Sequence, residues 1–322
     1  MRSRVPAAGV FLVFSAILWA AAPGAAWRDL NLGRADQALQ TLNNSLAQNP
    51  NDAESHNLRC RVYYQESEWE KAIADCEAAV ALAPQDSTDH LWLARAYGRK
   101  ASAAPALLAY KFARRAHAEF EKAVQLDPHN AAALSDLGEF DVDAPAVVGG
   151  GIAHAQDLVA PLRALNPSDA LALQARIAEA QKQPAAAEAD LKAAIAVSPH
   201  PADAWMDLAT FYLRQKRPDA MLAAARTGAS LDRRHGPALV QGANDLILAK
   251  LEPQTAIRWL TEYLNAHAQS ERAPTFVVRA ELANLLLNQG DNQAAQQQLA
   301  AVHALASGYR VPALSVSAKS GV

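Results

Sequence analysis

The sequence is poor in the residue types and spacings that usually mark a catalytic or metal site. Its 322 residues include two cysteines, and these do not form a C-x-x-C pair, so a redox-active dithiol is not expected. The nine histidines are scattered, and none has the spacing of a metal-ligand pair such as H-E-x-x-H. No G-x-S-x-G nucleophile motif occurs either. We therefore expect no enzyme, no metal and no cofactor.

An excess of charge and a large share of aromatic residues are also lacking. The chain has 30 basic and 33 acidic residues, for a net charge of −3. A nucleic-acid-binding protein usually presents a basic face, so a nucleic-acid partner is not expected. Aromatic residues make up 6% of the chain against 51% hydrophobic residues, and alanine dominates. Such a composition favours helices that pack closely together.

The chain has one apolar run that bears on localisation, and this run is short. Arg2 and Arg4 precede the run at Val10–Trp19, and small residues follow it up to Ala26. This order is typical of a secretory signal peptide, and ten apolar residues are too few for an ordinary membrane span. An uncleaved anchor is the alternative interpretation. No cysteine follows the run directly, so we expect no lipoprotein anchor.

Small residues place the expected cleavage site after Ala26. Gly24 and Ala26 are both small, whereas Pro23 disfavours cleavage after Ala22. We expect a protein that is periplasmic or secreted and that keeps no stable membrane span after cleavage.

Proline recurs after alanine-rich stretches along most of the chain. Pro50, Pro84, Pro128, Pro167 and Pro199 are 34, 44, 39 and 32 residues apart. Because proline cannot continue a helix, each of these prolines marks the end of a helix. The spacing predicts a repeated unit of about 34 residues that holds two helices.

Small residues recur at two fixed distances before these prolines. Twelve and five residues before each stop lie, among others, Ala72 with Ala79, Ala116 with Ala123, and Ala187 with Ala194. Small side chains let neighbouring helices approach closely, and a larger one would cost about 1–3 kcal/mol. We therefore expect these residues at the helix contacts.

The first helices of the units carry a recognisable pattern. Trp205, Leu208, Ala209 and Tyr212 match W-x2-L-(G/A)-x2-Y. At these residues the sequence resembles the tetratricopeptide repeat (TPR) family, over roughly residues 29–310. The resemblance implies an all-α, right-handed α-solenoid of TPR helix hairpins with an extended concave surface. A generic alanine-rich helical bundle is the alternative.

The repeats define the expected domains. We expect a signal peptide at 1–26, a TPR solenoid at 27–313 and a flexible tail at 314–322. The half-repeat at 27–50, whose partner helix is missing or very short, is expected to cap the N-terminal end. In a solenoid each unit contacts only its sequence neighbours. The expected hairpins lie at about 51–86, 87–130, 131–169, 170–201, 202–235, 236–270 and 275–310.

Two units exceed the usual length. The unit at 87–130 is ten residues too long and holds an apolar, basic stretch around Tyr110 and Phe112. The unit at 131–169 is five residues too long, and its excess ends in Gly149, Gly150 and Gly151. No G-K-[ST] follows these glycines, so they do not form a phosphate-binding loop.

Each excess has two interpretations. The simpler ones are a longer helix with a solvated face and a flexible loop between helices. The alternative is that both insertions form the walls of a pocket, lined in addition by Arg95.

The resemblance also implies which residues face the groove. They are Asn57, Arg61 and Tyr64 in one unit, with Arg95 and Arg99 in the next. Arginine can hold a carboxylate through planar, bidentate contacts. The likeness to the TPR carboxylate clamp is loose, because the lysine and asparagine set of that clamp is incomplete here. Solvated arginines are the alternative.

Cys60 and Cys76 lie on the two helices of one hairpin. In an oxidising compartment they are candidates for a disulfide, and two buried free thiols are the alternative.

The whole pattern favours a non-catalytic scaffold that binds a protein or peptide partner in its concave groove, in the bacterial envelope. The alternative function is a small-molecule-binding accessory component of an envelope transport system.

Overall fold

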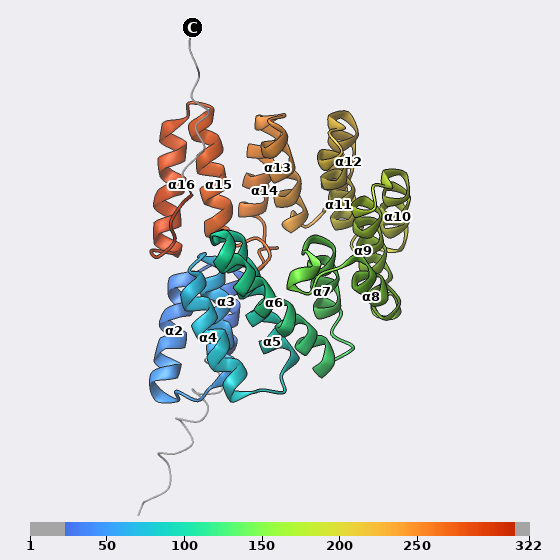
Figure 1. Ribbon diagram of the computed structural model, residues 1–322. Helices are drawn as coiled ribbons and strands as arrows, with labels where there is room; N and C mark the ends of the chain where they lie inside the picture. The colour runs from blue at the N-terminus through green and yellow to red at the C-terminus, as the bar shows by residue number, and fades with distance from the viewer. Residues whose placement is uncertain (1–22, 313–322) are drawn as a thin grey trace, which may run out of the picture.

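The computed structural model describes residues 23–312, which are helical without any strand (Figure 1). Residues 23–31 form a short first helix, and the remaining helices follow in consecutive packed pairs. The expected all-α solenoid of helix hairpins is confirmed. The expected tail at 314–322 and most of the expected signal peptide lie outside the described residues. In chain order the helices are α2 (Ala35–Gln48), α3 (Ala53–Gln65), α4 (Trp69–Leu82), α5 (Ser87–Ala103), α6 (Ala106–Leu126), α7 (Ala131–Asp143), the 3₁₀ helix η1 (Ala146–Val148), α8 (Ile152–Leu165), α9 (Pro167–Ala180), α10 (Pro184–Val197), α11 (Pro201–Arg214), α12 (Pro218–Leu231), α13 (Pro237–Ala249), α14 (Pro253–Asn265), α15 (Thr275–Asn288) and α16 (Asn292–Leu305).

Local chemistry explains where these helices begin and turn. From α9 to α14 every helix starts with a proline in its first turn, where the missing N–H costs no hydrogen bond. The turn inside most hairpins contains a residue in the left-handed conformation soon after the first helix, which ends that helix. These residues are Gly33, Ser67, Lys182, Lys216, Lys250 and Gly290, and the turn between α13 and α14 has a second one, Glu252.

The small residues of the predicted register form the helix contacts. Ala72, Ala79, Ala116, Ala123 and Ala187 each have 0% exposed surface. A side chain without bulk at these points lets the two helices of a hairpin, or of adjacent hairpins, pack at close range. The predicted register is confirmed.

The two helices of each hairpin differ in their place in the solenoid. First helices of several successive hairpins contact one another, namely α3 with α5, α5 with α7, α7 with α9, and α11 with α13. Second helices of neighbouring hairpins contact one another marginally at most. The first helices therefore lie on the inner, concave side of the curve, and the second helices lie outside.

The two long hairpins are ordered throughout. In the first, α5 and α6 have 17 and 21 residues, and their sequence excess lengthens both helices. In the second, η1 and the three glycines connect α7 to α8. Gly149 has φ +107° and a Cβ there would overlap the His117 ring, while the Gly151 amide donates to the Asp141 carbonyl at 2.8 Å. The glycine segment is therefore packed, contrary to the simpler expectation of a flexible loop.

A disulfide joins the first complete hairpin. Cys60 on α3 and Cys76 on α4 are bonded, with their Cα atoms 5.3 Å apart, and both side chains have no exposed surface. The bond ties together the two helices that carry part of the site described below.

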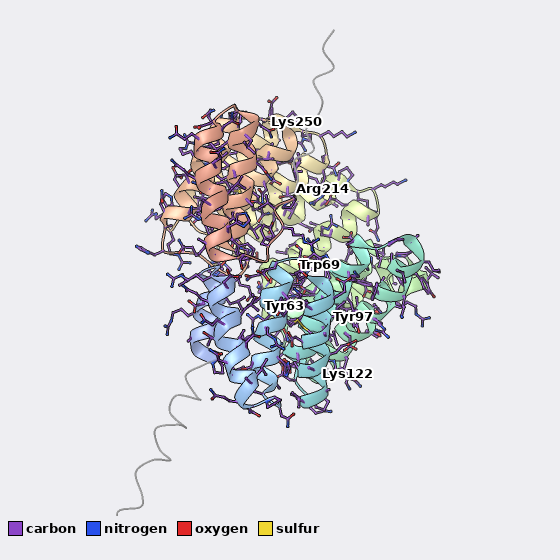
Figure 2. The ribbon with its side chains drawn as sticks, turned by 90° about the vertical axis from the view of Figure 1, so that its left-hand side faces the viewer. Tyr63, Trp69, Tyr97, Lys122, Arg214 and Lys250 are labelled. Carbon is purple, nitrogen blue, oxygen red and sulfur yellow. A yellow bond between two sulfur atoms is a disulfide. The ribbon has the colours of Figure 1, made fainter. Side chains whose placement is uncertain are left out.

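The first and last hairpins also contact each other, which the sequence did not predict. Figures 1 and 2 show α15 and α16 standing directly above α2 and α3. Phe276 and Tyr309 form an edge-to-face pair at 4.9 Å and share one core cluster with Leu30, Leu42 and Val62. The expectation that each unit contacts only its sequence neighbours is therefore wrong for the two ends.

Backbone groups take part in this junction between the chain ends. The Thr275 hydroxyl donates to the Leu32 carbonyl at 2.7 Å, and the Ser307 amide donates to the Asp36 carboxylate at 3.0 Å. Gly33 has φ +63°, and a Cβ at this position would overlap the backbone nitrogen of Thr275. The short first helix and α2 are thus more than a terminal cap, because they bind the last hairpin.

A buried tyrosine shapes the segment that carries the junction. Tyr263 on α14 has no exposed surface, and its hydroxyl donates to the Ala273 carbonyl at 2.5 Å. It also accepts from the Ser270 amide at 3.2 Å. These bonds fold residues 266–274 back against α14 and present Glu271 to α3, where it pairs with Arg61.

Candidate binding site on the concave face

A pocket of about 840 Å³ opens on the concave side between the two long hairpins. Its floor comes from α5 and α7, and one wall comes from the extended part of α6. The turn at 144–148 supplies the opposite wall, so both insertions border the same space. Its principal lining side chains are Tyr64, Arg95, Arg99, Tyr110, Phe120, Asp136, Glu139, Phe140, Asp143, Val147 and Val148.

Aromatic rings and arginines interleave at one end of the pocket. The Tyr64 ring packs edge-on against Trp69 at 5.6 Å and against Trp92 at 5.5 Å. The Arg95 guanidinium lies 4.6 Å from the centre of the Trp92 ring, and that of Arg99 lies 5.4 Å from Trp69. Cation–π contacts of this kind hold a guanidinium in place without neutralising it.

Ion pairs neutralise some, but not all, of the charges that line the pocket. The Arg95 Nε lies 2.5 Å from the Asp136 carboxylate, and the Asp143 carboxylate lies 2.7 Å from Arg176. Among the described residues, neither Arg99 nor Glu139 has an oppositely charged partner within 4.0 Å. The pocket therefore contains one unpaired cation and one unpaired carboxyl group.

The protein around Glu139 shifts its proton equilibrium. Glu139 is exposed to the concave space, where partial loss of hydration raises the pKa of its carboxyl group above the ordinary value; repulsion by Asp136 adds to the shift and Arg176 opposes it. Burial also raises the pKa of the Tyr64 hydroxyl, with Arg99 opposing the shift. The positive charge of Arg99 therefore favours the ionised form of the Tyr64 hydroxyl. A further positive charge near Glu139 would likewise favour its ionised carboxylate.

The remainder of the pocket is apolar. Phe120 and Val148 are buried at its base, whereas Tyr110 and Val147 are 39% and 65% exposed at its rim. Large apolar side chains exposed around a concave space are typical of a ligand site.

The predicted site residues divide into two groups. Tyr64, Arg95, Arg99 and Tyr110 come together in the pocket. Asn57 is buried, and its amide donates to the Asp89 carboxylate at 2.7 Å, so it is not accessible to a groove ligand.

Three further predictions fall outside the lining. Arg61 binds Glu271, with its Nε 2.9 Å from Oε1, and is therefore neutralised. The Phe112 ring stacks on Tyr97 at 6.2 Å and belongs to the core around α5 and α6. Gly149, Gly150 and Gly151 support the turn from behind, and the preceding valines face the pocket.

Sequence reasoning missed Glu139 as a pocket residue. It lies three residues after Asp136 and four before Asp143, so all three carboxyl groups share one face of α7. That spacing was the available signal, but an acidic cluster at a helix end is ordinarily a solvated feature. Val147 and Val148 carried no signal, because a short turn has no periodicity.

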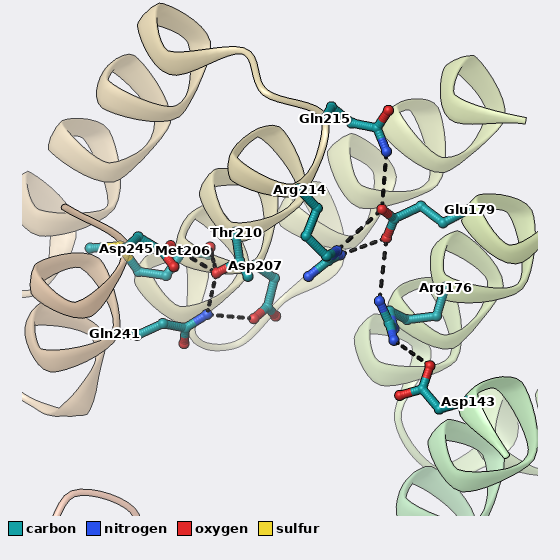
Figure 3. Close-up of polar contacts among 10 residues, drawn as sticks. All are labelled: Asp143, Arg176, Glu179, Met206, Asp207, Thr210, Arg214, Gln215, Gln241 and Asp245. Atoms are coloured by element: carbon teal, nitrogen blue, oxygen red, sulfur yellow. Dashed lines mark hydrogen bonds and ion pairs between the residues drawn. The ribbon is translucent and has the colours of Figure 1, made fainter. Parts of the chain in front are cut away.

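Beyond the pocket, polar side chains bridge the first helices along the concave face (Figure 3). Arg176 on α9 pairs with Asp143 on α7, and Glu179 on α9 pairs with Arg214 on α11 at 2.5 Å. Between α11 and α13, Thr210 donates to Asp245 at 2.8 Å. Asp143 and Arg214 side chains remain 65% and 37% exposed, so the network is open to a partner.

The described residues contain no cluster of side chains suited to hold a metal ion. In the same part of the chain, no helix has both the length and the apolar character that crossing a membrane requires.

Comparison with known proteins identifies the repeats. Residues 24–87 and 178–233 each match a tetratricopeptide repeat family model. No curated protein matches the chain significantly. The predicted likeness to tetratricopeptide repeats is confirmed over these two segments.

Two solved structures are similar in fold. One is a thermophilic TPR protein in Thermus thermophilus, with 19% identity and a TM-score of 0.47; the match covers 71% of this chain and 99% of that one. The other is a tetratricopeptide repeat protein from Parabacteroides merdae, with 12% identity and a TM-score of 0.49; the match covers 84% of this chain and 100% of that one.

Proposed function

We propose that the chain is a non-catalytic scaffold that binds a protein or peptide partner on its concave face. Tetratricopeptide repeats generally mediate protein interactions, and two segments of the chain match them. The observation that carries the proposal is the open polar network of α7, α9 and α11, in which charged side chains are held in fixed positions yet remain accessible. Positioned polar groups of this kind give a partner its register and specificity.

Site-specific cross-linking tests this proposal. A photoreactive amino acid replaces Asp207, which is exposed on the concave helix α11, and in a second variant it replaces Arg226, which is exposed on the outer helix α12. Both residues belong to the same hairpin. We expect a discrete cross-linked product from the first variant in cells of the source organism. Equal products from both variants, or none from the concave position, would contradict a concave binding face.

We further propose that the chain works in the bacterial envelope after export. The order of arginines, apolar run and small residues at the N-terminus supports this location. Ala26 is buried in the cluster that also holds Leu30 and Phe276, so cleavage after Ala26 removes part of that contact. N-terminal sequencing of protein from the periplasmic fraction should begin at Trp27. Full-length chains that still begin at Met1 would contradict cleavage.

A second candidate function is favoured by one observation. The two lengthened hairpins border a common pocket of about 840 Å³, which lies within the size range of small-molecule sites. A small-molecule-binding accessory of envelope transport would use this pocket. Native mass spectrometry of protein purified gently from its own envelope fraction tests it, because a bound molecule adds a reproducible mass of a few hundred daltons, on the scale of a drug-sized ligand. A bare chain would count against this candidate and leave the scaffold proposal in place.

A further inference from the structure

The pocket between the long hairpins contains two charges that the described part of the chain leaves without an opposite charge, and they differ in sign. Arg99 lies on α5, and Glu139 lies on α7. We infer that the pocket binds a small zwitterion with an apolar body, a free peptide of about two to four residues, whose size suits a pocket of this volume. The inference rests on the second candidate function.

Arg99 is suited to receive the ligand carboxylate. Its guanidinium is held against the Trp69 ring at 5.4 Å and forms no ion pair among residues 23–312. Tyr64, which also lines the pocket, packs against the same Trp69 ring, and its hydroxyl forms no hydrogen bond with the described residues. A guanidinium offers two parallel donors to a carboxylate, and the hydroxyl adds a third.

Glu139 is suited to receive the ligand ammonium group. The neighbouring carboxylates of Asp136 and Asp143 already bind Arg95 and Arg176, which leaves Glu139 as the acceptor without a cation. Partial loss of hydration in the concavity and repulsion by both neighbours raise the pKa of its carboxyl group above the ordinary value. An ammonium group at this point would supply the missing positive charge and favour the ionised carboxylate.

The pocket discriminates against ligands of one charge. A simple anion that reaches Arg99 meets the unpaired carboxyl group of Glu139 on the pocket wall. A simple cation that reaches Glu139 meets the unpaired guanidinium of Arg99. Because Arg99 and Glu139 are more than 4.0 Å apart and do not pair, the two charges of the ligand must be separated as well. The two ends of a short peptide meet this condition, and they are separated by side chains that can pack on Tyr110, Val147 and Val148.

Paired ligand and residue changes test the inference. The probes are the peptides Leu-Leu, Leu-Ala-Leu and Leu-Ala-Ala-Leu, each also prepared with an acetylated N-terminus and with an amidated C-terminus. Binding to the full chain at pH 7.5 is measured by titration calorimetry. We expect at least one free peptide to bind, and we expect blocking either of its ends to weaken binding by about 10- to 100-fold, as the loss of a charged hydrogen bond does.

The variants must then show matching selectivity. Arg99→Gln should weaken binding of the free peptide and of its N-acetyl form, which both carry a carboxylate, about 10- to 100-fold. It should leave binding of the C-terminal amide nearly unchanged. Glu139→Gln should weaken binding of the free peptide and of the amide, which both carry an ammonium group, and should leave binding of the N-acetyl form nearly unchanged. Lys111→Gln removes an exposed charge from α6 outside the pocket lining and should change none of them. Circular dichroism confirms that each variant is folded.

The outcomes separate this inference from the function on which it rests. If no free peptide binds at millimolar concentration, or if the blocked and free forms bind equally, the zwitterion inference is wrong. Native mass spectrometry then decides the second candidate function independently. A co-purified molecule without both charged ends supports the pocket as a small-molecule site. A bare chain contradicts the second candidate function as well as the zwitterion inference.

Discussion

Arg61 on α3 and Glu271 before α15 form a bidentate ion pair although 210 positions separate them in the sequence. The Arg61 Nε lies 2.9 Å from one carboxylate oxygen, and a second guanidinium nitrogen contacts the other. Their side chains are 15% and 16% exposed. The pair therefore joins the first complete hairpin to the last part of the chain in a mostly buried position.

Glu271→Gln should lower the free energy of unfolding by about 1–3 kcal/mol, because it leaves the Arg61 cation partly buried without its counter-charge. Urea unfolding followed by circular dichroism measures the change. The control is Glu252→Gln, which breaks the more exposed pair with Arg226 and should cost about 1 kcal/mol or less. Equal losses in both variants would mean that the junction contributes no more than a surface pair.

Gly33→Ala should destabilise the chain more than Gly290→Ala. Both glycines have a positive φ, +63° and +85°. An alanine in this left-handed conformation should lower the free energy of unfolding by about 1–2 kcal/mol in both variants. At Gly33 the added Cβ would also overlap Thr275, whereas nothing lies within 4 Å at Gly290. We expect an additional loss of about 1–3 kcal/mol at Gly33 from this overlap. Thermal unfolding compares the two, and equal losses would contradict a close contact between the chain ends.

The disulfide should contribute measurably to stability. Closure of a loop with a sequence separation of 16 is worth about 3 kcal/mol in the chain-entropy treatment. A reductant should therefore lower the Tm of the wild-type chain, but it should not change the Tm of the double variant Cys60→Ala, Cys76→Ala. Under denaturing, non-reducing conditions, a maleimide should label no thiol in protein purified from the envelope. One equivalent of label on each cysteine would contradict the bond.

Stability should fall as pH rises from about 4.5 to about 7, in part because of Glu66. This carboxyl group is 5% exposed beside Gly308 at the junction. Burial raises its pKa to about 7, and repulsion by Asp36 adds to the shift. The folded chain then keeps a proton that the unfolded chain has released, so folding is favoured at low pH and this advantage is lost through pH 7.

Glu66→Gln tests this linkage because glutamine has the same size and does not titrate. The difference in free energy of unfolding between wild type and variant should change by up to about 3 kcal/mol between pH 4.5 and pH 7.5, since one pKa unit corresponds to about 1.4 kcal/mol. Buried groups elsewhere titrate equally in both proteins. A difference that stays constant over this range would show that Glu66 ionises normally.

Ala72→Leu should destabilise α4 at its contact with its neighbours, whereas Ala74→Leu on the same helix should not. Ala72 has no exposed surface and lies in the core around Cys60 and Tyr97, while Ala74 is exposed. Overpacking at Ala72 should cost about 1–3 kcal/mol, seen as a lower Tm. Similar effects of the two substitutions would contradict the helix register.

The sequence predicted the hairpins well because their determinants are local. Ala72 and Ala79 recur at fixed distances before Pro84, and both are buried in the structure. Tyr64, Arg95 and Arg99 were predicted as inner-face residues from the repeat pattern, and they meet in one pocket. In each case the relevant contact lies within one hairpin or between two consecutive ones, a distance over which helical periodicity is informative.

The junction could not be predicted in the same way. Whether Thr275 reaches Leu32 depends on small rotations that add up over all the intervening hairpins, and no local pattern records their sum. Gly33 did not indicate a contact with Thr275, because a glycine after a short helix is common. Glu139 was visible in the sequence but indistinguishable from solvated helix-end carboxylates until the turn at 144–148 was seen beside it.

The contact between the chain ends changes the expected order of unfolding. An open array of hairpins frays from its termini, because an end unit has one neighbour instead of two. Here α2 and α16 each have a neighbour on both sides, so amide hydrogen exchange at the two ends should be as slow as in the middle hairpins. The same contact joins residues more than 240 positions apart, so during synthesis the first helices gain these contacts only after α15 and α16 have been made.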